Sequence, residues 1–135
     1  MTTVTYQPIV ITGPDSFAAH LNRLFSSIYP PGRGPFTSQE LIAALTMRGV
    51  LLSAPYLSQL RTGNRTRPSR ETMGHLADFF GVKPDYFTDP DYRAVVDEDL
   101  HWLDLAHDPT VRRLTTALNE LDAETREQLL TAAGA

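Results

Sequence analysis

Apolar side chains recur at helical spacing along most of the chain from residue 16 onward. Within residues 16–29 they stand at positions i, i+4, i+7, i+8 and i+11, which form one face of a helix. The run Pro30-Pro31-Gly32 cannot continue that helix, so a loop is expected up to Phe36. No strand is predicted after residue 16, whereas residues 1–15 read as a poorly ordered or strand-like arm. The fold class predicted is therefore all-α.

Start and stop signals divide the next stretch into further short helices. Thr37 and Glu40 form a capping box, in which each side chain bonds the backbone N–H of the other. Pro55 is tolerated in a first turn, where its missing N–H has no helical partner. Pro84 opens a short helix in which Tyr86 and Phe87 close the core. The expected caps and stops are Thr37 and Gly49, Ser53 and Gly63, and Ser69 and Gly81. The expected inward positions are Leu41, Ile42, Leu45 and, as a further candidate, Met47, then Leu57, Leu60, Met73, Leu76, Ala77 and Phe80.

The C-terminal segment, residues 92–135, continues as helices with a different character. A helix is expected over residues 92–106, Asp108 caps the next one, and Asp122 caps the last. An apolar stripe at 3-4-3 spacing runs along the middle helix and consists of Val111, Leu114, Leu118 and Leu121. This stripe is either intramolecular core or a dimer interface, and the interface is favoured because so short a segment buries little alone. The residues expected at that interface are Trp102, Val111, Leu114, Leu118, Leu121 and Leu129.

Composition excludes several classes of protein. The chain has 135 residues, of which 41% are hydrophobic and 21% charged, so it can form a core and is not globally disordered. It contains no cysteine, which excludes disulfides, thiolate zinc sites and cysteine nucleophiles. No apolar run approaches the roughly 20 residues that span a bilayer. The first 22 residues lack Lys and Arg, so no signal peptide is predicted and the expected compartment is the cytoplasm.

Charge is divided unevenly along the chain. The net charge is -4, but residues 1–83 hold eight basic and four acidic side chains, a net +4. Residues 84–135 hold four basic and twelve acidic side chains, a net -8. The basic charge of residues 1–83 favours contact with a polyanion, whereas the acidic residues 84–135 are expected to have a different function. The alternative is that both charged regions are ordinary solvated surfaces.

The predicted second and third helices, with the loop that follows, have the layout of a helix-turn-helix. A short capped helix fits the DNA major groove, and its amides and dipole favour phosphate. Gln59 can bond adenine through two hydrogen bonds, and Ser58 can bond a purine or a phosphate. The residues expected at bases or in the groove are Ala54, Pro55, Tyr56, Ser58 and Gln59. The residues expected at phosphates are Ser38, Arg61, Asn64, Arg65, Thr66, Arg67 and Arg70.

Longer motifs connect this region with a known family. Residues 57–65, Pro68-Ser69, residues 76–82 and Tyr86-Phe87 together resemble the lambda-repressor-like (XRE) helix-turn-helix family. Within it, residues 21–25, 29–35 and 53–61 are similar to a mycobacterial nucleoid-associated regulator. The resemblance covers about residues 16–92. It implies a helix-turn-helix domain followed by a helical dimerisation segment, in a homodimer that binds and bridges double-stranded DNA and influences genes for virulence-type secretion.

The resemblance also sets the expected domain organisation. An N-terminal arm is predicted for residues 1–15, a DNA-binding domain for residues 16–91 and an acidic dimerisation segment for residues 92–135. Residues 46–52 depart from the family pattern, because they are several residues longer than the usual tight turn between the second and third helices. The extension precedes the recognition helix and leaves it intact.

The main alternative is an adaptor that uses the same helical surface to hold a protein partner. An enzyme is disfavoured, because no Gly-x-Ser-x-Gly elbow, phosphate-binding Gly-rich loop or His-Glu-x-x-His motif is present. The four histidines do not cluster in sequence, and His101 and His107 are six residues apart, which places them on different faces of a helix. No catalytic residue, metal site, cofactor or small-molecule ligand is therefore predicted.

Overall fold

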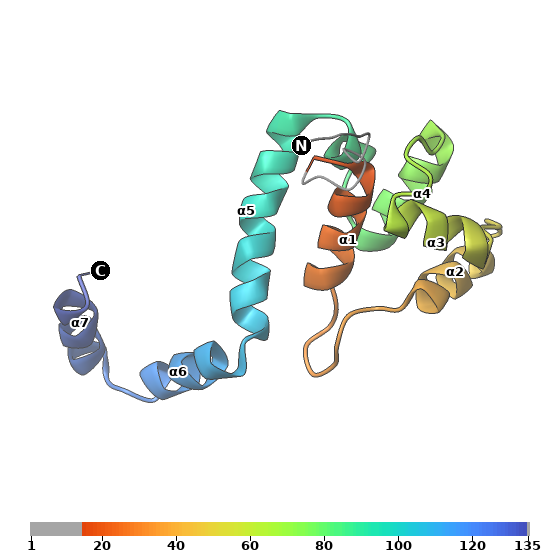
Figure 1. Cartoon of the computed structure of the whole chain (residues 1–135). Coiled ribbons are helices and arrows are strands. Elements are labelled where there is room, and N and C mark those ends of the chain that lie inside the picture. The colour runs from red at the N-terminus through yellow and green to blue at the C-terminus, as the bar shows by residue number, and fades with distance from the viewer. Residues whose placement is uncertain (1–14, 135) are drawn as a thin grey trace, which may run out of the picture. The chain divides into compact units, whose positions relative to one another are not determined.

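A computed structural model describes residues 15–134 of the chain, and within that range every regular element is a helix. The all-α prediction is confirmed. Residues 1–14 of the predicted arm lie outside the described residues. The elements are α1 (Phe17–Ser27), α2 (Ser38–Met47), α3 (Ala54–Thr62), α4 (Arg70–Phe80), the 3-10 helix η2 (Pro84–Phe87), α5 (Pro90–His107), α6 (Pro109–Asn119) and α7 (Ala123–Ala132) (Figure 1).

Most of the predicted helix starts are confirmed by their capping hydrogen bonds, whereas α5 begins at Pro90, two residues before its predicted start at residue 92. Glu40 donates its backbone N–H to the Thr37 hydroxyl over 3.1 Å, and the Thr37 N–H reaches Glu40 Oε1 over 2.8 Å. Gly63 and Gly81 end α3 and α4 with φ values of 87° and 76°, which only glycine adopts without strain. The other side chains that accept a backbone N–H at a helix start are Ser16, Ser53, Ser69, Asp108 and Asp122.

Residues 15–101 form one compact unit around a single core. In this unit α3 packs against α1 and α2, α4 packs against α2 and η2, and η2 packs against α1 (Figure 1). The first part of α5 belongs to the same unit, because Val96 and Leu100 are buried in its core. The remaining members of the core are Leu21, Leu24, Phe25, Leu41, Leu45, Leu57, Leu60, Leu76, Ala77, Phe80, Tyr86 and Phe87.

Met47 was a candidate core residue, and that prediction was wrong. Its side chain is 90% exposed. Leu41 and Leu45 are four residues apart and share the buried face of α2, whereas Met47 follows Leu45 by two residues and therefore lies on the opposite side.

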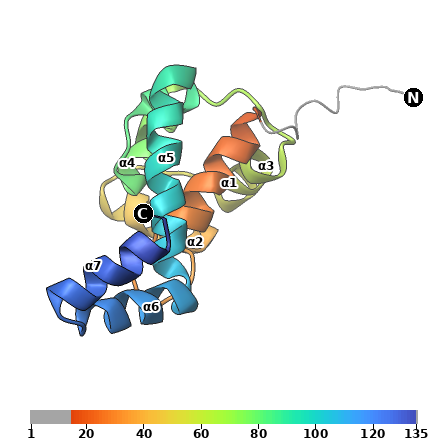
Figure 2. The same ribbon diagram turned by 90° about the vertical axis from the view of Figure 1, so that its left-hand side faces the viewer.

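Residues 102–134 form a second unit with little burial of its own. None of the described residues in α6 or α7 is buried. Figure 2 shows the two short helices joined by a turn. Arg126 of α7 donates to the carbonyl oxygens of Leu118 and Leu121 over 3.0 and 2.8 Å, which satisfies acceptors at the end of α6. This unit is therefore organised by local hydrogen bonds, and its apolar stripe is only partly covered: Leu114 is exposed, and Val111, Leu118 and Leu121 are half-buried.

Candidate nucleic-acid interface

Helix α3 is anchored on its inner face and open on its outer face. The Ser53 hydroxyl caps it by accepting the backbone N–H of Tyr56 over 3.2 Å. Leu57 and Leu60 point into the core and are fully buried. Of the residues predicted to meet bases or the groove, Ala54, Pro55 and Ser58 are exposed, and Tyr56 and Gln59 are half-buried. These five residues lie together on α3, outside the core.

Arg61 lies at the end of α3 and bonds two other helices. Its Nε–H donates to Asn22 Oδ1 over 2.8 Å, and Nη1 donates to the Ser38 hydroxyl over 2.9 Å. Asn22 in turn donates its amide to the Arg61 carbonyl oxygen over 2.9 Å. The guanidinium carbon lies 3.8 Å from the centre of the Phe25 ring, a close cation–π contact. Arg61 thus joins α1, α2 and α3.

This network uses two residues that the sequence predicted at phosphates, Arg61 and Ser38. Arg61 is half-buried, and burial lowers its pKa, although a guanidinium remains charged at neutral pH. Asn22 was not predicted as part of the site. Its only sequence signal is a polar side chain beside the apolar face of α1, and Arg61 is 39 residues away along the chain.

Arg65 is held against the outer face of α3. Its Nε–H donates to Gln59 Oε1 over 2.9 Å, and its backbone N–H donates to the Gln59 carbonyl oxygen over 3.0 Å. Its guanidinium carbon lies 5.7 Å from the centre of the Tyr56 ring. The left-handed Gly63 reverses the chain and allows this approach. Tyr56 and Gln59, predicted at bases or in the groove, and Arg65, predicted at phosphates, therefore form one cluster.

The arginine loop, residues 63–68, is exposed at most of its polar positions. Asn64, Thr66 and Arg67 are exposed, and so is Arg70, the first residue of α4. Pro68 is buried and fixes the loop to the body of the unit. The loop therefore presents positive charge directly beside the exposed face of α3.

The segment between α2 and α3 is longer than a tight turn, as the sequence indicated. Val50 donates its backbone N–H to the Leu45 carbonyl oxygen over 2.9 Å, which closes the end of α2. Leu51 is 87% exposed, and Arg48 pairs with Asp78 of α4 over 2.7 Å. Val50 and Leu52 are half-buried against the core, so the extension is held to the domain and leaves α3 in place.

Contacts from α5 reinforce the helices behind α3. The Tyr86 hydroxyl donates to Asp97 Oδ1 over 2.7 Å, and Arg93 Nε–H donates to the Tyr86 carbonyl oxygen over 3.0 Å. Burial, followed by the hydrogen bond to the Asp97 carboxylate, raises the pKa of Tyr86 well above its usual range. His20 lies edge-on to Tyr86, with ring centres 6.1 Å apart. These polar contacts fix the start of α5 to the core.

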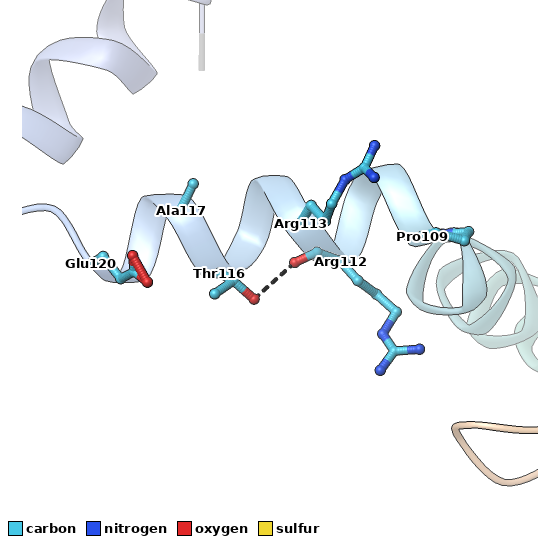
Figure 3. Close-up of a pocket in the computed structure, with 6 residues that line it drawn as sticks. All are labelled: Pro109, Arg112, Arg113, Thr116, Ala117 and Glu120. Carbon is cyan, nitrogen blue, oxygen red and sulfur yellow. Dashed lines mark hydrogen bonds between the residues drawn. The ribbon is translucent and has the colours of Figure 1, made fainter.

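The residues predicted at a dimer interface all belong to the second unit, where they lie on the last part of α5, on α6, on α7 and, for Leu121, in the turn between α6 and α7. Trp102, Leu114 and Leu129 are 65%, 59% and 48% exposed, and the other members are partly buried: Val111, Leu118 and Leu121. A hollow along α6 is lined by Pro109, Arg112, Arg113, Thr116, Ala117 and Glu120 (Figure 3). Arg112 and Arg113 project to different sides of the helix in that view, so the hollow does not gather its charges around one ligand position.

Residues 15–134 contain no group of three His, Asp or Glu side chains that could hold a metal ion. In the same range, no helix combines the length and apolar character needed to cross a membrane.

Comparison with known proteins gives one strong likeness. No family model matches the chain. Over 115 residues it is 52% identical to the nucleoid-associated protein EspR of Mycobacterium tuberculosis, in the strains CDC 1551 / Oshkosh and ATCC 25618 / H37Rv. The match covers 85% of this chain and 87% of each relative. The chain belongs to the EspR family. Because the EspR match is 115 residues long and the first compact unit ends at His101, the likeness also includes part of the C-terminal unit.

Proposed function

We propose that this chain is a nucleoid-associated transcriptional regulator that binds double-stranded DNA through a helix-turn-helix formed by α2 and α3. One observation carries the proposal: α3 is capped and anchored by two buried leucines, and its exposed face lies beside the arginine loop. The likeness to the nucleoid-associated EspR supports the same function. The chain then acts at the nucleoid in the cytoplasm and is not an enzyme.

The phosphate contacts are assigned to the exposed residues around the loop. Asn64, Thr66, Arg67 and Arg70 stand beside α3, where polar and cationic side chains position a protein on the DNA backbone. Arg61 and Ser38 bond each other, and we assign them the task of holding α3 at a fixed position on α1 and α2.

The rest of the chain joins two copies of the protein, so that the homodimer has two DNA-binding domains, or binding heads. The predicted division after residue 91 is moved to residue 101, because Val96 and Leu100 are buried in the core of the first unit. We propose an arm over residues 1–15, a DNA-binding domain over residues 16–101 and a dimerisation segment over residues 102–135. The apolar stripe supports a homodimer, because Leu114 is 59% exposed and no residue of α6 is buried, and a partner would stabilise such a surface. Two linked heads bind with an avidity roughly 10²–10⁴ times that of one where both reach DNA, and they can bridge separate sites.

Salt dependence tests the phosphate contacts. Arg67→Ala combined with Arg70→Ala weakens binding to every duplex, and each lost contact flattens the slope of log K against log salt by about 0.9. Fluorescence anisotropy with a labelled duplex at several salt concentrations measures that slope. The matched control is Arg112→Ala with Arg113→Ala, which removes the same charge from α6 and leaves the domain intact. Absence of salt-dependent binding by the unaltered protein contradicts the proposal and favours a protein-binding adaptor.

A further inference from the structure

We infer that Gln59 and Arg65 form a single base-reading unit that offers only hydrogen-bond donors and therefore selects guanine. The inference rests on the proposed DNA-binding function and specifies the base that α3 reads. It replaces the sequence-based prediction of an adenine contact by Gln59 and a phosphate contact by Arg65.

The geometry fixes which atoms of Gln59 remain available. Arg65 Nε–H donates to the Gln59 side chain over 2.9 Å. Arginine carries donors and no acceptor, so the amide atom facing it must be the oxygen, Oε1. The amide nitrogen Nε2 then points elsewhere as a donor. Arg65 uses only Nε in this bond, so its two terminal nitrogens also remain donors.

Base chemistry then decides the partner. A glutamine that reads adenine must accept from N6 and donate to N7, and the acceptor it needs is the oxygen that Arg65 already holds. Guanine presents two adjacent acceptors, N7 and O6, which match a guanidinium fork and an amide donor. Cytosine presents a donor at N4, so a surface made of donors disfavours it.

The unit is held in place before DNA arrives. The backbone N–H of Arg65 bonds the Gln59 carbonyl oxygen over 3.0 Å, and the Tyr56 ring lies 5.7 Å from the guanidinium carbon. Gln59 and Tyr56 are half-buried on α3, so neither swings as freely as an exposed side chain. A prearranged fork loses less conformational freedom on binding than a mobile arginine.

Base analogues test the assignment on the full chain. A preferred duplex is selected from a random pool, and single purines are replaced by 7-deazaguanine or 7-deazaadenine, which lack only the N7 acceptor. We expect 7-deazaguanine at one guanine to weaken binding by about tenfold or more, and 7-deazaadenine to leave it nearly unchanged. Fluorescence anisotropy at one salt concentration measures both effects.

Substitutions show whether the two side chains act together. Gln59→Ala and Arg65→Ala each abolish the penalty for 7-deazaguanine, and the double variant loses no more discrimination than either single one. Gln59→Glu keeps an acceptor for Arg65 but replaces the outward amide donor with a second acceptor, so it weakens the guanine preference. Arg67→Ala, the matched control from the same loop, lowers affinity for all duplexes and keeps the penalty.

Each outcome has a separate meaning. A penalty confined to 7-deazaadenine that Arg65→Ala leaves intact overturns the inference and restores the adenine contact. Binding to DNA with no penalty from either analogue also overturns it. Failure to bind any duplex overturns the proposed function itself.

Discussion

At the scale of single residues, Arg61 shows how one side chain fixes the position of a helix. It bonds Asn22 and Ser38 and stacks on Phe25, so it links three helices beneath the exposed face of α3. Arg61→Lys keeps the positive charge but removes the guanidinium that bonds Asn22 and Ser38 at the same time. We expect it to lower the free energy of unfolding by about 1–2 kcal/mol. Urea denaturation measures that change. DNA affinity should fall with no change in salt slope, and a slope flattened by about 0.9 would show instead that Arg61 contacts phosphate.

His20 makes the stability of the first unit depend on pH. It is buried, and burial lowers its pKa, with a further contribution from Arg93; Asp15 and Asp97 oppose the shift. Because the folded state resists protonation while the unfolded state takes up a proton near pH 6.5, stability is full above that pH and falls as the pH drops below it. Thermal unfolding between pH 5 and 8 measures the trend. His20→Gln, which stays neutral, should flatten it, and a curve that keeps its slope would assign the effect to another group.

At the scale of elements, the recognition helix depends on its cap. Ser53 satisfies one of the backbone N–H groups that a helix start leaves open, and Pro55 removes another. We expect Ser53→Ala to lower the free energy of unfolding by about 1 kcal/mol, and Ser53→Asp to restore most of it, because aspartate also caps. Chemical denaturation of the two variants measures this difference. Equal losses for both would mean that the site needs the small hydroxyl for a reason other than capping.

At the scale of the whole molecule, the core determines where the chain can be divided. Val96 and Leu100 are buried, and Asp97 accepts the Tyr86 hydroxyl. A chain ending after Asp91 lacks both side chains, and losing their burial against the core costs about 3–5 kcal/mol. We therefore expect residues 1–101 to fold as a monomer and residues 1–91 to be much less stable, as circular dichroism and light scattering will show. A dimer of residues 1–101 would place the interface outside α6.

In our proposal the apolar stripe on α6 forms the homodimer interface. We expect Leu114→Glu to convert the homodimer to a monomer, because it puts a charge in the middle of the stripe. Thr116→Glu adds the same charge on the opposite side of α6 and should leave the dimer intact. Light scattering measures the mass, and DNA binding should lose the gain that two heads provide. If both variants behave alike, the stripe is not the interface.

The sequence by itself determined the helices and their limits, because caps, glycine stops and apolar periodicity act over a few residues. Thr37 with Glu40, Ser53 with Gly63, and the buried leucines of α3 all follow from such local rules. Tertiary structure decided which polar side chains meet. The Arg61 bond to Asn22 spans 39 residues, and the Arg65 bond to Gln59 depends on the chain reversal at Gly63, so neither could be read from spacing along one helix. Local chemistry therefore fixes the elements, whereas packing assigns the partners of their polar residues, since long-range hydrogen bonds form only after the core has brought distant segments together.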